Sequence, residues 1–258
     1  MRPGSVLVAY PHPATEVQHA FSVSLIALAN YDAAHNQRVT GAGGPLMMRC
    51  GTSGLVDARN KMVAHFLDEA DDEWLWMVDT DMGFAADTVD RLVEAADPVD
   101  RPVVGALCFG LKMSDPDGYG GYETAPFPTI YGWVKQANGH NGFKSADNYP
   151  RDTLLQVAGT GAACLLVHRT AAEKVRAEHG DRWFDPVRYP DGRWVSEDLS
   201  FCYRLGALSI PIYVHTGVKT THAKTVWVGE QQWAAHKALT EMVHAAVAAE
   251  QPEPAGVG

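Results

Sequence analysis

Residues 74–81 consist of an apolar run, Trp74-Leu75-Trp76-Met77-Val78, followed directly by Asp79-Thr80-Asp81. Such a run without a polar face is typical of a strand that is buried on both sides of a sheet. A helix-like segment follows, so the two carboxylates stand at the carboxyl end of a buried strand. Carboxylates in this position can share a divalent cation, which can neutralise a diphosphate. We therefore predict that the chain handles a phosphorylated substrate.

The same spacing occurs a second time, in Asp115-Pro116-Asp117. That copy lies in a stretch rich in Gly, Pro and Asp, which is typical of a loop. Only the copy at Asp79 has a strand before it. An alternative remains open for this copy, namely that the two aspartates only cap the helix that follows.

The composition indicates a soluble globular protein. With 258 residues, 46% hydrophobic and 20% charged, the chain is long enough for one large α/β domain or two small ones. We predict one domain over residues 1–250 and a disordered tail over 251–258. The formal net charge of -10 and the lack of a basic run argue against binding to duplex nucleic acid. An acidic chain that holds a diphosphate needs a metal ion or helix N-termini to offset the repulsion.

The sequence also bears on localisation. The N-terminal residues lack the apolar stretch of a signal peptide, and no segment is long enough to span a bilayer. The four cysteines, Cys50, Cys108, Cys164 and Cys202, form no CxxC pair, which favours buried free thiols over a zinc site or disulfides. We expect a cytoplasmic protein of a bacterium or of a phage-infected host cell. The oligomeric state is not predicted.

Strand-like and helix-like patterns alternate along the first half, which predicts a mainly parallel sheet flanked by helices. Strands are expected over residues 5–9, 74–78, 103–109 and 210–214, with two more inside 154–167. The first helix is expected to start at a capping box at Thr15 and to have an apolar stripe at positions 17, 21, 25 and 28. Further helices are expected over 53–69, from 89 to Pro98, over 196–205 and over 231–248, and Gly206 is expected to end the helix over 196–205. Residues 111–128 have few apolar side chains, and we expect a mobile surface loop there.

A second acidic pair, Glu197-Asp198, follows Ser196 at the start of a predicted helix. Ser196 can cap that helix, and the helix dipole would keep a carboxylate in the first turn ionised. An ionised carboxylate that faces a bound electrophile can act as a general base. The alternative is favourable charge at a helix N-terminus and nothing more.

His222 ends the polar segment that follows the last predicted core strand. Neutral imidazole is a common ligand of metals such as Mn²⁺, and a loop beyond a strand edge could bring it to Asp79 and Asp81. Lone histidines more often have a structural role, and His215 is the nearest competitor.

Four features of this chain occur in an order that resembles GT-A glycosyltransferases of the family 2 type. They are the strand with its DxD, the turn Gly159-Thr160-Gly161, the Ser-Glu-Asp helix start and the downstream His222. The resemblance extends from Val6 to His222. It implies a Rossmann-like nucleotide-diphospho-sugar transferase fold in a single domain. It also implies that Asp79, Asp81 and His222 bind Mn²⁺ or Mg²⁺.

The resemblance assigns further residues to the donor. Arg59-Asn60 would face the nucleotide or the diphosphate, Asp79-Thr80 would contact the sugar nucleotide, and Gly159, Thr160 and Gly161 would lie near the donor sugar. Tyr10 or His12 would stack on the base, because Pro11 and Pro13 leave few backbone N–H groups in the first loop.

On the acceptor side, the resemblance assigns Glu197 and Asp198 as the acidic pair, with Asp198 as the base if the enzyme inverts. We expect Trp183 and Phe184 to contribute to acceptor binding together with residues 111–128 and the C-terminal helix, although such an aromatic pair is equally consistent with a core position. Residues 111–128 could also close over the donor as a lid.

The sequence thus predicts metal-dependent transfer of a sugar from a UDP- or GDP-sugar to a hydroxyl group of a glycan, protein or small molecule. Two alternatives remain. A nucleotidyltransferase would also use paired carboxylates and a metal, but residues 10–15 contain no Lys or Arg for a triphosphate. A non-catalytic nucleotide-sugar binding protein of the same fold is the other alternative.

Overall fold

A computed structural model describes residues 2–12, 16–39, 44–114, 123–135, 139, 141–189 and 191–249. These divide into two compact units. The first comprises residues 1–111 and 126–224, and the second comprises residues 112–125 and 225–258. The predicted tail, 251–258, lies outside the described residues, and the prediction of one domain through residue 250 stays a prediction.

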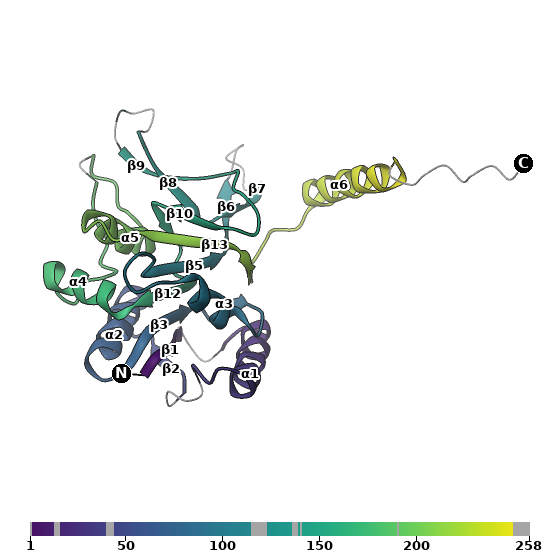
Figure 1. The fold of residues 1–258 in the computed structure, drawn as a ribbon. Coiled ribbons are helices and arrows are strands. Elements are labelled where there is room, and N and C mark those ends of the chain that lie inside the picture. Colours follow the sequence, from purple (N-terminus) through teal and green to yellow (C-terminus); the bar gives the residue numbers. More distant parts are fainter. Residues whose placement is uncertain are drawn as a thin grey trace, which may run out of the picture. The chain divides into compact units, whose positions relative to one another are not determined.

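A seven-stranded sheet forms the centre of the first unit (Figure 1). Five strands run in one direction, while the other two, the fourth in the order and one edge strand, run in the opposite direction. The mainly parallel α/β sheet predicted from the sequence is confirmed. In spatial order the strands are β10 (Leu154–Val157), β13 (Ile212–Lys219), β5 (Val103–Leu107), β12 (Cys164–His168), β3 (Asp72–Val78), β1 (Arg2–His12) and β2 (Leu46–Arg49).

Strand β3 explains why the apolar run has no polar face. Leu75 and Met77 pack into one hydrophobic core, whereas Trp74, Trp76 and Val78 pack into another on the opposite face of the sheet. Alternate side chains of a strand point to opposite faces, so a strand covered on both sides needs apolar residues at every position. The Asp79-Thr80-Asp81 triplet therefore follows a strand that packed side chains hold in place on both faces of the sheet.

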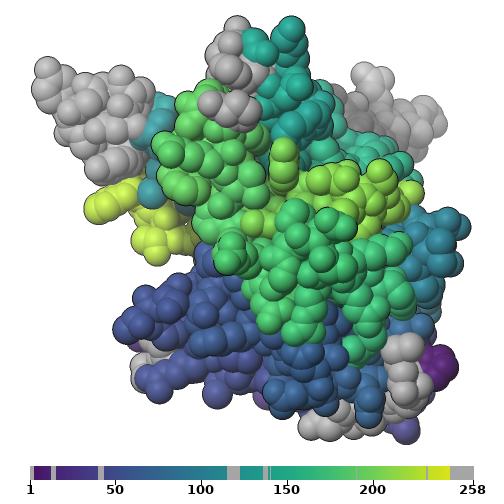
Figure 2. Space-filling model, turned by 90° about the vertical axis from the view of Figure 1, so that its left-hand side faces the viewer, coloured from purple at the N-terminus to yellow at the C-terminus, as the bar shows by residue number. Residues whose placement is uncertain are grey.

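Helices cover both faces of the sheet. Helices α2 (Gly54–Asp68), α4 (Arg169–His179) and α5 (Glu197–Ala207) contribute to the core that contains Leu75, while α1 (His19–Ala34) and α3 (Thr88–Ala95) contribute to the other core. Figure 2 shows the first of these faces, with the blue atoms of the α2 region beside the green atoms of the α4 and α5 regions.

The described residues also form three smaller sheets. Strands β8 (Ile130–Lys135), β9 (Asn141–Ser145) and β11 (Gly159–Thr160) form the first. The others are the pair β4 (Met82–Gly83) and β14 (Thr221–His222), and the pair β6 (Phe109–Ser114) and β7 (Glu123–Pro128). Helix α6 (Glu230–Ala249), which was predicted over 231–248, belongs to the second unit.

Three local predictions were wrong. Helix α1 begins at His19, so position 17 of the predicted helical stripe lies before the helix; the predicted cap, Thr15, lies outside the described residues. Helix α5 continues through Gly206 to Ala207. The predicted loop 111–128 contains the end of β6 and all of β7, and only 115–122 lie outside the described residues.

Candidate active site

The acidic triplet forms a tight turn between β3 and β4. The backbone N–H of Asp79 donates to the carbonyl of Ala163 (3.0 Å), and the N–H of Met82 donates to the carbonyl of Asp79 (3.2 Å). Because the chain turns here, the carboxylates of Asp79 and Asp81 do not share one strand face. The two carboxylates instead meet different partners.

Asp81 meets the predicted histidine. The Nε2 atom of His222 lies 3.0 Å from Oδ2 of Asp81, although 141 positions separate them in the sequence. The pairing of β14 with β4 brings them together, with His222 opposite Met82. Gly83 allows this close pairing, because a Cβ at that position would lie 2.5 Å from Oγ1 of Thr221. His215, the competing histidine, lies on β13, and its Nδ1 accepts from the N–H of Gly217.

The hydrogen bonds of His222 fit a cation ligand. Its Nδ1 atom lies 2.8 Å from the carbonyl oxygen of Phe109, which can only accept, so Nδ1 carries a proton. In a neutral ring, Nε2 then presents a lone pair to the carboxylate of Asp81. Two acceptors at this distance require a positive charge between them, either a second proton on the ring or a metal ion. A backbone carbonyl that fixes the imidazole in this way is the usual second contact of a metal-bound histidine.

The role of Lys224 at this site was not predicted from the sequence. Its ammonium lies 3.0 Å from the same Oδ2 atom of Asp81 that faces His222. Burial opposes ionisation of Asp81, but the hydrogen bonds from His222 and Lys224 outweigh it and lower the pKa of this carboxyl. The sequence feature that could have indicated this role is the position of Lys224, two residues after the predicted metal ligand His222.

Asp79 pairs with a buried guanidinium instead. The NH2 group of Arg59 lies 3.0 and 3.1 Å from the two carboxylate oxygens of Asp79. Arg59, on α2, is only 1% exposed and also contacts Glu197 (3.2 Å) and Asp198. A buried cation needs such partners to offset the loss of hydration. Arg59 therefore binds three carboxylates of the site, and its contact with the nucleotide or diphosphate stays a prediction.

These contacts also limit the predicted metal site. No three His, Cys, Asp or Glu side chains within the described part of the chain are grouped closely enough to hold a metal ion. Asp81 and His222 form a pair that fits a divalent cation, whereas the carboxylate of Asp79 is occupied by Arg59. Mg²⁺ and Mn²⁺ commonly take few protein ligands and complete their coordination with water and substrate phosphates.

Asp198 lies in the first turn of α5 beside Arg59. Burial raises the pKa of this carboxyl to about 6; Arg59 opposes the rise, while the negative charges of Glu197 and Asp79 add to it. A carboxylate with this pKa is well matched to accept a proton near neutral pH. Ser196 precedes the helix as predicted, but its side chain makes no capping hydrogen bond.

The glycine turn packs directly against α5. A Cβ at Gly159 would lie 2.9 Å from Cδ2 of Leu199, so this position has room only for glycine. Thr160 is buried, and its backbone N–H lies 3.4 Å from Sγ of Cys202. At Gly161 a Cβ would lie 3.6 Å from Oδ2 of Asp198. The turn thus packs beside the acidic pair, with Gly161 next to Asp198.

A cavity of about 480 Å³ lies at the carboxyl end of β1. Its walls come from the end of β1, the residues before α1, the residues before α2 with the start of that helix, and the acidic triplet. The lining residues are Pro11, Glu16, Val17, Gln18, Cys50, Gly51, Gly54, Leu55, Asp79, Thr80 and Asp81. Gly54 and Leu55 begin helix α2, and a helix N-terminus favours anions. The cavity therefore combines carboxylates that can hold a cation with backbone groups that can hold a phosphate.

Two predicted donor residues lie on β1 before this cavity. Tyr10 is half-buried and packs edge-on against Phe21, with 5.2 Å between the ring centroids. His12 is also half-buried; its Nδ1 atom is buried without a hydrogen-bond partner in the described residues, and its carbonyl accepts from Cys50. His12 thus has an unused polar atom, whereas the ring of Tyr10 contributes to packing.

The remaining predicted residues have structural positions. Asn60 donates to Asp185 (2.8 Å) and accepts from the N–H of Phe184 (2.8 Å), so it fixes the segment before α5. Trp183 and Phe184 are both fully buried. Trp183 donates from Nε1 to the carbonyl of Ala172, and the Phe184 ring packs on Phe201. We correct their assignment as acceptor contacts, because neither side chain offers surface to a ligand.

The sequence predicts no membrane-spanning segment. In the described residues, no helix combines the length and the apolar character needed to cross a membrane.

Comparisons with known proteins complete the description. No protein-family profile matches the chain, and no curated protein matches it. Among solved structures, GalNAc-T7 with UDP, GalNAc and Mn²⁺ is similar over 86% of this chain and 44% of its own, with a TM-score of 0.52 and 11% identity. A197 from STIV has a TM-score of 0.46 and 14% identity, with 86% of each chain covered. A glycosyltransferase involved in the glycosylation of the major capsid of PBCV-1 has a TM-score of 0.41 and 12% identity, with 91% of this chain and 99% of its own covered.

The chain thus spans less than half the length of the GalNAc-T7 chain. At 11% identity the likeness concerns the fold. This protein has a GT-A-like glycosyltransferase fold.

Proposed function

We propose that the protein transfers a sugar from a nucleoside-diphosphate sugar to a hydroxyl group of an acceptor. The observation that carries the proposal is the 3.0 Å contact between His222 and Asp81, which brings an imidazole and a carboxylate together at the end of β3, where both could ligate one cation. The fold and the 480 Å³ cavity next to this pair support the same conclusion.

Asp81 and His222 would hold Mn²⁺ or Mg²⁺. Such an ion, when bound, supplies positive charge that stabilises the departing nucleoside diphosphate. The N-terminus of α2 would bind phosphate oxygens in the cavity. The donor would be a UDP- or GDP-sugar, with Thr80 among the residues that line its cavity.

Asp198 would act as the base in an inverting reaction. The acceptor oxygen forms a bond to the anomeric carbon, the bond from that carbon to the diphosphate oxygen breaks, and the hydroxyl proton passes to the carboxylate of Asp198. Arg59 orients this carboxylate and keeps it ionised, and it holds Glu197 beside it.

The test is to incubate the full chain with Mn²⁺ and a panel of UDP- and GDP-sugars and to measure the released nucleotide. We expect one donor to be hydrolysed slowly to its nucleoside diphosphate, with activity lost on chelation. His222→Ala should reduce the rate by about 100-fold or more, because a metal supplies several kcal/mol of charge stabilisation. His215→Ala is the matched control, because it removes a nearby histidine that does not contact Asp81.

Other products would identify the alternatives. Pyrophosphate in place of a nucleoside diphosphate would identify a nucleotidyltransferase. Metal-dependent nucleotide binding without any turnover would identify a binding protein. Either result would contradict the proposal.

A further inference from the structure

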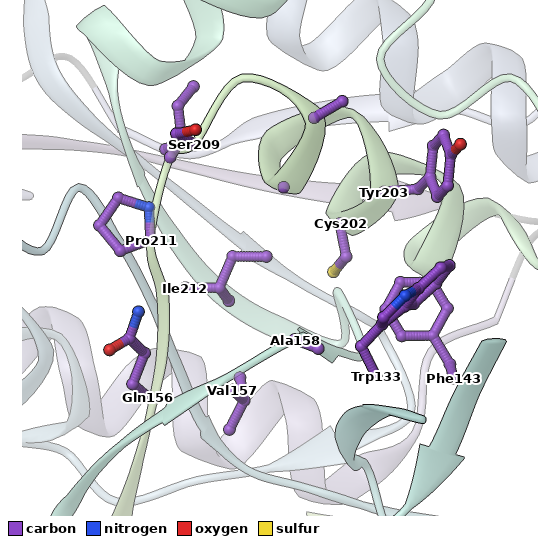
Figure 3. Close-up of a pocket in the computed structure, with 13 residues that line it drawn as sticks. Trp133, Phe143, Gln156, Val157, Ala158, Cys202, Tyr203, Ser209, Pro211 and Ile212 are labelled. Atoms are coloured by element: carbon purple, nitrogen blue, oxygen red, sulfur yellow. The ribbon is translucent and has the colours of Figure 1, made fainter. Parts of the chain in front are cut away.

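A second cavity of about 560 Å³ lies at the C-terminal part of α5, away from the acidic triplet (Figure 3). Apolar side chains form its floor, including Val157, Cys202 and Ile212, and polar groups of Gln156 and Ser209 lie at its edge. Its volume is in the range of small-molecule sites. Among its described lining residues none is charged, which disfavours a phosphate or another ion as the occupant.

Two exposed aromatic rings stand at this cavity. Trp133 on β8 is 44% exposed and Tyr203 on α5 is 40% exposed, and their ring centroids are 5.9 Å apart. Phe143 on β9 packs edge-on against Trp133 at 4.9 Å and lies close to Gly159. The Trp133 ring is thus supported on one side and open on another. We refer to Trp133 and Tyr203 as the aromatic platform.

The platform suits a sugar ring. A pyranose has a face of C–H groups and a rim of hydroxyls, and Trp and Tyr likewise combine an apolar ring with a polar group at the edge. The polar groups of Gln156, Ser209 and Tyr203 can hydrogen-bond sugar hydroxyls, whereas a hydrocarbon chain has no group that uses them. Exposed aromatic clusters on a folded protein commonly mark a binding site.

The elements that carry the platform also reach the candidate base. Cys202, in the cavity floor, is four residues after Asp198 and therefore lies on the same face of α5. Tyr203 follows Asp198 by about 7.5 Å along the helix axis and about 140° around it, so the cavity floor at Cys202, rather than the Tyr203 ring, lies on the helix face of the base. On β8, Tyr131 and Trp133 point to the same face, and burial together with the charge of Asp198 raises the pKa of Tyr131 to about 12. The same two elements, α5 and β8, therefore carry both Asp198 and the platform.

Resting on the proposed function, we propose that the aromatic platform and its cavity form an outer acceptor subsite, which stacks a sugar ring of an oligosaccharide whose reacting hydroxyl lies at Asp198. The preferred acceptor is then a glycan of at least two sugar units, and a free monosaccharide fills only the inner position.

The test measures retention of the full chain, with Mn²⁺ and UDP, on an array of oligosaccharides and matched monosaccharides. The wild type should retain at least one oligosaccharide about tenfold better than its monosaccharide. Trp133→Ala and Tyr203→Ala should each weaken that retention about tenfold, and Trp133→Phe should restore most of it, because a phenyl ring still stacks. Trp227→Ala, which removes an exposed tryptophan outside both the cavity and the C-terminal helix, should leave retention unchanged. Circular dichroism and thermal melting show whether each variant is folded.

The outcomes separate the two proposals. Donor hydrolysis without retention of any oligosaccharide, or retention that does not depend on Trp133 and Tyr203, would overturn the outer subsite and leave sugar transfer standing. Platform-dependent retention without any donor hydrolysis would overturn sugar transfer and support the cavity as a glycan site. Retention of every alkyl-linked spot regardless of its sugar would assign the cavity to a hydrocarbon chain and overturn the inference.

Discussion

Asp79 and Asp81 are separated by one residue, yet their carboxylates lie in different electrostatic environments. Asp79 binds Arg59, a buried cation that cannot lose its proton in a protein. Asp81 binds His222 and Lys224, which are more exposed than Arg59 and can exchange for other cations. The difference teaches that two carboxylates one residue apart can have different partners; under the proposed function, Asp79 serves the internal charge network and Asp81 the metal.

The largest expected effect concerns the buried side of this comparison. Arg59→Met should lower the free energy of unfolding by about 3–5 kcal/mol, because it leaves three carboxylates without their shared cation. Urea denaturation measures the change. Arg176→Met is the matched control, since Arg176 also binds two carboxylates but at the surface, and should cost about 1 kcal/mol or less. Equal losses in the two variants would show that Arg59 is not a buried clamp.

A second effect concerns pH. Asp198 must be ionised to accept a proton, so kcat/KM should rise with pH to a midpoint near 6 and then level off. Below the midpoint it should fall about tenfold per pH unit. Asp79→Asn should move the midpoint to lower pH, because the negative charge of Asp79 helps to raise the pKa of Asp198. Transfer rates at saturating Mn²⁺ test this, and a midpoint that stays in place or rises in the variant would contradict the shared network.

The smallest effect concerns Lys224. Its ammonium competes with a metal for Asp81 Oδ2, and the pair is partly exposed. Lys224→Ala should therefore tighten Mn²⁺ binding by up to about fivefold, the range expected from the loss of a surface ion pair. Lys219→Ala, which removes a lysine that pairs with Asp152 instead, serves as the control. Weaker Mn²⁺ binding by Lys224→Ala would mean that Lys224 assists the metal.

Much of the fold could be predicted because it follows from local patterns. The apolar run at Trp74 to Val78 has only one stable environment, a sheet interior, and α2 was expected within one residue of its ends at Gly54 and Asp68. The strands β6 and β7 were missed because their pairing depends on contacts between segments that carry no apolar pattern of their own. Non-local pairing of this kind is not encoded in a short window of sequence.

The site could be predicted in part for a related reason. Asp81 and His222 were expected to meet, and they do. For Arg59 the sequence shows a cation but not its burial, so its role as a clamp for three carboxylates was not foreseen. For Trp183 and Phe184 the sequence shows two aromatic rings but not their orientation, and the structure buries both. The platform at Trp133 was not foreseen, because β8 and α5 meet only in the folded chain.

The most direct test compares the two aspartates as metal ligands, by titration of the full chain with Mn²⁺ and detection of free Mn²⁺ by electron paramagnetic resonance. Asp81→Asn and His222→Ala should each weaken binding at least about tenfold, whereas Asp79→Asn should bind within about threefold of the wild type. A loss in Asp79→Asn as large as that in Asp81→Asn would contradict the assignment of the cation to Asp81 and His222.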